Sequence, residues 1–295
     1  MLQANSQERY QQNAVRCSFH GRRVFEVPSS EKDRLETYGS STTVFEFSSQ
    51  VARTKLPTPR EALQYRYYMT STIKYTFEFE DGSSWVYDLH FDAEHFFIPK
   101  IDVPRNEWTE LGFQQCPNCP LKTADCAQCP VARNLHQVVE DSKATLSVKR
   151  AKVRVETSER HYEKECATQE GLRSLFGVVM ASSGCPHLDW LRPLARFHLP
   201  FSDTDETLFR VLSLEALKSF FSGKEVSLDS VSKKIGDRYK EVETVNHSFV
   251  KRIRTYCQAD ADKNAIAALD VFVQMFPYQM QSDFGSLRVL FTEKK

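Results

Sequence analysis

Two Cys-x-x-Cys pairs stand close together near the middle of the chain and constrain its fold more than any other feature. The first pair is Cys116 and Cys119, the second is Cys126 and Cys129, and six residues separate them. Each pair places two sulfur atoms on one tight turn, and two such turns can complete a tetrahedral set of four thiolates. The spacing predicts a metal or cluster site without indicating what the protein does.

Structural zinc is the leading interpretation of these cysteines, because zinc prefers tetrahedral sulfur ligands and needs no electron chemistry. An iron–sulfur cluster is the alternative, since Cys-Pro steps recur in ferredoxin-type loops. The chain opens without the basic and then apolar layout of an export signal. We therefore expect a cytoplasmic protein with reduced thiols, which makes disulfides a weaker interpretation.

A further cysteine leaves the identity of the fourth ligand open. Cys185 lies in a Gly-Cys-Pro-His turn after a predicted helix, where it could deliver a sulfur to a site built elsewhere. Two ligand sets are compatible with the residues: Cys116, Cys119 and Cys129 with either Cys126 or Cys185. In the second set the metal would join the sheet region to the helical region. His187 is a weaker candidate ligand.

Alternating apolar and polar residues predict strands in the first half of the chain. The segments 73–79 and 85–91 alternate on either side of Asp81-Gly82, a dipeptide that suits a type I′ hairpin turn. We expect further strands at 96–98 and within 146–157.

Helical spacing of apolar residues begins after Pro130, so Cys129 should lie at a helix N-terminus, where partial positive charge favours a thiolate. Another helix should start at Thr168. Three longer helices are predicted to close the chain, the first with Phe220 on its apolar face and the third kinked at Pro277. Strands followed by helices indicate an α+β fold: an antiparallel hairpin-based sheet with a Cys-rich metal loop, then a mostly helical C-terminal half.

Composition divides the chain into three regions. Residues 1–68 have short apolar islands between polar stretches, which predicts a poorly ordered extension and leaves Met69 open as an alternative start. Residues 69–160 should form the β-rich region with the Cys-rich metal loop. Residues 161–295 should form a helical region packed on it.

Charge and motif content exclude several functions. Lys and Arg total 39, as do Asp and Glu, so overall charge gives no reason to expect a nucleic-acid partner. No apolar run reaches the roughly 20 residues of a membrane helix. Glycine-rich nucleotide loops, HExxH and GxSxG are absent, so no catalytic residue is assigned and the partner is unknown.

Arg192, Arg196 and His198 form the densest polar cluster apart from the cysteines. Two guanidinium groups one helical turn apart could bind an anionic substrate, which is the basis for an enzyme hypothesis. The competing interpretation is a structural ion pair with Asp189, Asp203 or Asp205.

Four segments of the chain resemble an uncharacterised bacterial family of unknown function, from about residue 69 to the C-terminus. They read CPNCPL, CPVA, SSGCPH and RPLARFHLPF, and they begin at residues 116, 129, 182 and 192. The resemblance implies ligands at Cys116, Cys119, Cys129 and Cys185 more firmly than at Cys126, and it implies no activity. The predicted function is a metal-stabilised binding or regulatory module with structural zinc. An iron–sulfur electron-transfer protein and an enzyme using the Arg192 cluster are the alternatives.

Overall fold

The computed structural model describes residues 71–98, 103, 105–224, 226–257, 260, 263, 264, 266 and 284–291. The chain divides into two units, Met1–Tyr65 and Arg66–Lys295, and all the described residues belong to the second. The extension predicted over residues 1–68 lies outside the described residues.

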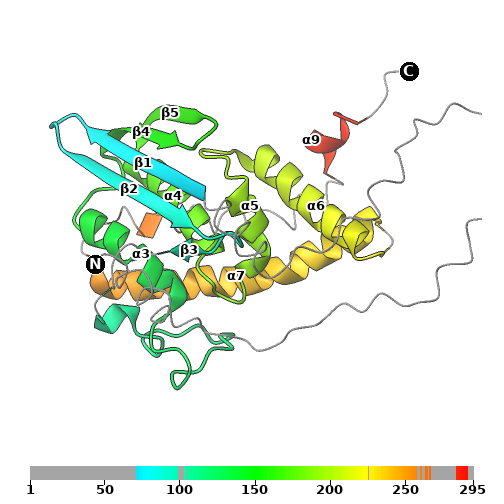
Figure 1. Cartoon of the computed structure of the whole chain (residues 1–295), viewed down its shortest axis with the longest axis horizontal. Coiled ribbons are helices and arrows are strands. Elements are labelled where there is room, and N and C mark those ends of the chain that lie inside the picture. The colour runs from blue at the N-terminus through cyan, green and yellow to red at the C-terminus, as the bar shows by residue number, and fades with distance from the viewer. Residues whose placement is uncertain are drawn as a thin grey trace, which may run out of the picture. The chain divides into compact units, whose positions relative to one another are not determined.

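Five strands form one antiparallel sheet in the order β3-β2-β1-β4-β5 (Figure 1). The strands are β1 (Ser71–Phe79), β2 (Ser84–Phe91), β3 (Phe97–Ile98), β4 (Arg150–Glu156) and β5 (His161–Ala167). The predicted alternation is confirmed, since Tyr75 and Phe77 are fully buried on the inner face. On the outer face of β4, Lys152 and Arg154 form ion pairs with Glu163 at 3.0 and 2.9 Å.

The turn between β1 and β2 differs from the predicted type I′ turn. The Phe79 N–H donates to the Ser83 carbonyl at 2.9 Å, and the Gly82 N–H donates to the Phe79 carbonyl at 3.0 Å. Gly82 alone in this turn has a positive φ, of 80°, whereas a type I′ turn needs two such residues. The connection is a three-residue loop, so the predicted turn type was wrong. The Asp81 carboxylate stabilises this loop by accepting a hydrogen bond from the Ser83 N–H.

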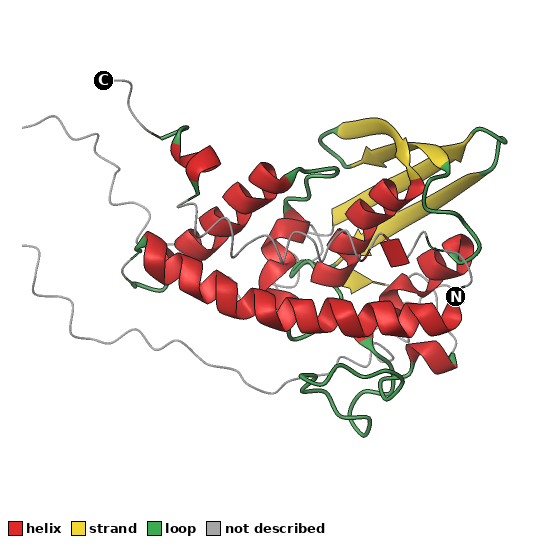
Figure 2. Cartoon of the chain, turned by 180° about the vertical axis from the view of Figure 1, so that it is seen from behind, coloured by secondary structure: helices red, strands yellow, loops and turns green. Residues whose placement is uncertain are grey.

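The helices follow mainly in the second half, which confirms the α+β class. They are α3 (Pro130–Ser142), α4 (Thr168–Ala181), α5 (Arg192–Arg196), α6 (Thr204–Phe221), α7 (Leu228–Tyr256) and α9 (Gly285–Arg288), with 3-10 turns η2 (Glu107–Thr109) and η3 (Asp189–Leu191). Figures 1 and 2 show α3, α4 and α5 between the sheet and the long helix α7. None of the described helices is long and apolar enough to cross a bilayer. The predicted kink at Pro277 lies outside the described residues.

Helix α6 buries Leu208 and Val211, which fit the predicted apolar face, but not Phe220. Its buried residues include Leu208, Val211, Glu215 and Ser219, whereas Phe220 is 68% exposed. The stripe that repeats every three to four residues runs through the polar Glu215, whose carboxylate pairs with Arg238 of α7 at 2.7 Å. The apolar character of Phe220 was therefore a misleading guide to its orientation.

Candidate functional site

The cysteine-rich segment forms a loop that is closed at its base. We call residues 111–128 the cysteine loop. The Leu111 N–H donates to the Ala127 carbonyl at 2.9 Å, and the Cys129 N–H donates to the Thr109 carbonyl at 2.8 Å. These two hydrogen bonds align the entering and leaving chain as a short antiparallel pair. The base therefore brings Cys129 back beside the beginning of the loop.

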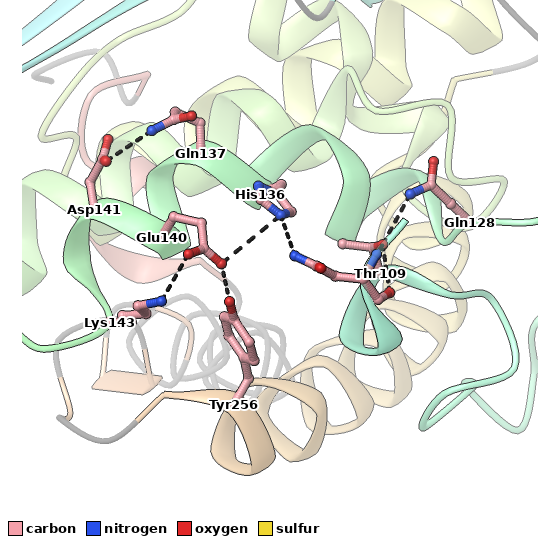
Figure 3. A network of polar contacts seen from close by, with 9 residues as sticks. Thr109, Gln128, His136, Gln137, Glu140, Asp141, Lys143 and Tyr256 are labelled. Atoms are coloured by element: carbon pink, nitrogen blue, oxygen red, sulfur yellow. Dashed lines mark hydrogen bonds and ion pairs between the residues drawn. The ribbon is translucent and has the colours of Figure 1, made fainter. Parts of the chain in front are cut away.

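The residues just before the cysteine loop are anchored to α3 and α7. Trp108 is 1% exposed, and its ring stacks on His136 of α3 and on Tyr256 of α7, with ring centroids 5.7 and 5.2 Å apart. Figure 3 shows the polar network beside this stack, where the Glu140 carboxylate contacts the Tyr256 hydroxyl and accepts from Lys143 at 2.8 Å. The loop thus starts from a fixed point between two helices.

Four cysteines from three segments line one cavity of about 20 Å³. We call Cys116, Cys119, Cys129 and Cys185 the cysteine quartet, and each of its members is half-buried with a free thiol. Cys126 does not line this cavity, and its sulfur is part of a disulfide bond, so the expectation that all the thiols are reduced was wrong for this residue. Of the two ligand sets left open by the sequence, the structure gathers the one that contains Cys185 around a cavity.

Local backbone structure explains how each member of the quartet reaches the cavity. The Cys119 N–H donates to the Cys116 carbonyl at 3.0 Å, which makes the first Cys-x-x-Cys pair a tight turn. Cys129 is the N-cap residue of α3, with proline at the first helical position, as predicted. Cys185 follows the end of α4, where Gly184 has a φ of 84° and lets the chain reverse.

Two thiols of the quartet, those of Cys116 and Cys185, are held in the protonated form at neutral pH. Burial, together with the neighbouring Cys129 sulfur, raises the pKa of Cys116 to about 11 and that of Cys185 to about 12. Within the described part of the chain, no three His, Cys, Asp or Glu side chains stand where they would hold a metal ion together. Neutral thiols have no attraction that draws their sulfur atoms toward a common centre. Metal binding would therefore require these side chains to turn inward and lose their protons.

Arg252 of α7 is a buried cation that sequence reasoning missed. It lines the same cavity, is 2% exposed, and its Nη1 donates to the carbonyl oxygens of Trp108 at 2.6 Å and Glu110 at 2.7 Å. These bonds hold the base of the cysteine loop against α7. The available signal was its position in the apolar stripe between Phe249 and Tyr256, where a charged residue is unusual.

His187 connects the Cys185 turn to the first Cys-x-x-Cys pair. Its Nε2 lies 2.6 Å from the Asn118 carbonyl oxygen, and its Nδ1 lies 3.4 Å from the Glu241 carboxylate of α7. The Asn118 amide also donates to the Glu241 carboxylate at 2.6 Å. Both ring nitrogens therefore face oxygen acceptors, which gives His187 the geometry of a cross-link between segments.

The three residues of the suggested anion site engage different partners. Arg192 pairs with Asp189 at 3.1 Å, one of the partners considered from the sequence. His198 points inward, with its Nε2 2.5 Å from the Tyr75 hydroxyl. Arg196 is exposed at the end of α5. The three side chains thus have different direct partners, although Arg192 and Arg196 both lie near the buried His95.

Comparison with known proteins identifies the family to which the chain belongs but does not indicate an activity. A family described as a domain of unknown function, DUF6901, matches residues 73–292, so the chain belongs to this family. The match contains the whole quartet and confirms the predicted resemblance to an uncharacterised family. No curated protein and no solved structure matches the chain.

Proposed function

We propose that this member of the DUF6901 family is a metal-stabilised binding or regulatory module in which the cysteine quartet holds one structural zinc ion. The observation that carries the proposal is the convergence of four cysteines from three segments on one cavity. Four thiolates are a ligand set of closed structural zinc sites. Such a set leaves no coordination position for a substrate, so the protein would act by binding through its surface.

The size of the cavity supports a single ion over an iron–sulfur cluster. About 20 Å³ is little more than the roughly 10–15 Å³ that one water-sized sphere occupies. One ion fits such a space once the sulfur atoms turn toward it at about 2.3 Å. A cluster of several iron and sulfide ions would need the surrounding segments to move apart.

The ion would join three parts of the chain that the hydrogen bonds already bring near each other. Cys116 and Cys119 belong to the cysteine loop, Cys129 to the N-terminus of α3, and Cys185 to the turn after α4. A metal shared by these segments resists any opening that separates them, because such an opening would break metal–sulfur bonds. This supports a structural role for the ion.

The test is metal analysis of chain purified without oxygen, together with two matched variants. We expect a colourless protein with one zinc per chain. Replacement of Cys185 by Ser should abolish stoichiometric zinc because it removes a ligand, whereas Cys126→Ser should retain it. Circular dichroism checks that both variants fold.

Three outcomes would contradict the proposal. A brown protein whose visible band is bleached by dithionite would indicate an iron–sulfur cluster. Loss of zinc in Cys126→Ser but not in Cys185→Ser would indicate the other ligand set. A folded wild-type chain that takes up no zinc would show that the quartet is not a zinc site.

A further inference from the structure

Arg252 places a buried positive charge next to the cysteine quartet. Within the described residues, no Asp or Glu lies within ion-pair distance of its guanidinium group. The guanidinium group donates hydrogen bonds to the carbonyl oxygens of Trp108, Glu110 and Leu111. Burying a charge is costly unless it is both hydrogen-bonded and paired with an opposite charge. The carbonyl groups satisfy the requirement for hydrogen bonds but do not supply an opposite charge.

The sulfur atoms of the quartet, once deprotonated, could supply the opposite charge that the buried guanidinium group requires. Arg252 and all four cysteines line the same cavity. The Arg252 side chain is only 2% exposed, so water cannot supply the balancing charge. The guanidinium group is therefore well placed for a negatively charged centre and poorly placed for four neutral thiols.

We propose that Arg252 is the built-in counter-charge of the metal centre, a positioning residue that stabilises the thiolate form of the quartet. This inference rests on the proposed zinc site. A divalent ion with four thiolates has two excess negative charges, and one guanidinium group offsets half of that excess. The same side chain holds the base of the cysteine loop through the carbonyl groups of Trp108 and Glu110. Helix α7 thus contributes no ligand but provides the charge that makes the ligand set favourable.

The two roles of Arg252 can be separated by substitution. Arg252→Lys keeps the positive charge but has fewer donors, while Arg252→Gln keeps amide donors and loses the charge. Arg254→Gln is the matched control, because Arg254 lies on the same helix and is exposed. Removal of a residue that supports metal ligands typically weakens metal binding about 10- to 100-fold. We expect that loss in Arg252→Gln, near wild-type affinity in Arg252→Lys, and no change in Arg254→Gln.

The experiment measures zinc affinity by competition with a chromophoric chelator and records the Co²⁺ spectrum of each variant. The thiolate-to-cobalt charge-transfer band reports the charge around the sulfur atoms, which a purely structural role would not shift. Alkylation by iodoacetamide gives a second readout. We expect zinc-loaded Arg252→Gln to be alkylated faster than wild type, because its thiolates lose a neighbouring positive charge.

If zinc affinity falls equally in the Arg252→Lys and Arg252→Gln variants, the counter-charge role is overturned, because the effect would then come from lost hydrogen bonds. Wild-type affinity and an unshifted cobalt band in Arg252→Gln would overturn it as well. If the Gln variant does not fold, the Lys variant decides, because a tenfold loss of zinc affinity in folded Arg252→Lys contradicts the inference. If the wild-type chain binds neither zinc nor cobalt, the zinc site itself is overturned. This outcome differs from one in which the wild type binds zinc and only the role of Arg252 fails.

Discussion

His95 is a buried histidine that the fold keeps neutral. It is 4% exposed, its ring stacks on Phe91 with centroids 4.2 Å apart, and its Nδ1 lies 3.1 Å from the Ser71 hydroxyl. Burial lowers the pKa of His95 to about 4, and the charges of Arg196 and Arg192 act in the same direction. The unfolded chain, with an ordinary pKa of about 6.5, takes up a proton first as the pH falls. His95 therefore lowers stability in acid.

We predict that the free energy of unfolding falls as the pH drops from about 6.5 to 4, by about 1.4 kcal/mol per pH unit for His95 alone. His198 acts in the same sense, because burial also lowers its pKa, to about 3. Urea unfolding at a series of pH values measures the slope. His95→Asn should make it shallower, since asparagine tolerates the φ of 62° at this position and does not titrate. An unchanged slope would contradict this explanation.

Individual residues were predictable where a local rule decides their role. Cys129 was correctly expected at a helix N-terminus because proline follows it. Arg252 was missed because its role depends on carbonyl groups more than 140 positions away in the sequence. Composition and periodicity contain no information about such a contact.

At the scale of elements, α4 packs so closely on the sheet that one position requires glycine. A β-carbon at Gly171 would lie 2.5 Å from Cε1 of Phe77 and 2.9 Å from Cγ2 of Val153. Both neighbours are completely buried, so neither ring nor methyl group can move aside easily. This contact fixes the distance between the helix and the sheet.

Gly171→Ala should therefore lower the free energy of unfolding by about 1–3 kcal/mol, although alanine favours helices more than glycine does. Gly112→Ala is the control, because its nearest side-chain atom, on Thr123, lies 3.7 Å away and the substitution should be nearly neutral. Denaturant midpoints of the two variants measure the effect. A Gly171→Ala protein as stable as wild type would contradict this prediction, because it would show that α4 can shift without a loss of stability.

Strands and helices were predictable from periodicity, and the connections between them were not. The alternation from Ile73 to Phe79 and the stripe in α4 each reflect one buried face, which a single sequence reveals. The ladder that closes the cysteine loop involves only a few residues at each end, which is too short to produce a pattern. The wrong turn type at Gly82 has the same origin, because loop length depends on how the two strands pair.

For the whole molecule, the cysteine loop connects the two kinds of structure in the chain. Its base lies between the sheet strands β3 and β4 in the sequence, and its neighbours in space are α3, α7 and the turn after α4. The sequence suggested that a metal would join the sheet region to the helical region through Cys185. The structure gathers the quartet around one cavity, and the binding of a zinc ion there is the prediction that the account depends on.

The most direct test of this account is X-ray absorption at the zinc edge of the intact chain, purified without added metal. The account predicts a first shell of four sulfur atoms at about 2.3 Å. In the Cys185→Ser variant, any remaining zinc should have one sulfur fewer, replaced by a shorter bond to oxygen or nitrogen at about 2.0–2.1 Å. A wild-type zinc shell dominated by oxygen or nitrogen, or a metal edge belonging to iron, would contradict the central claim.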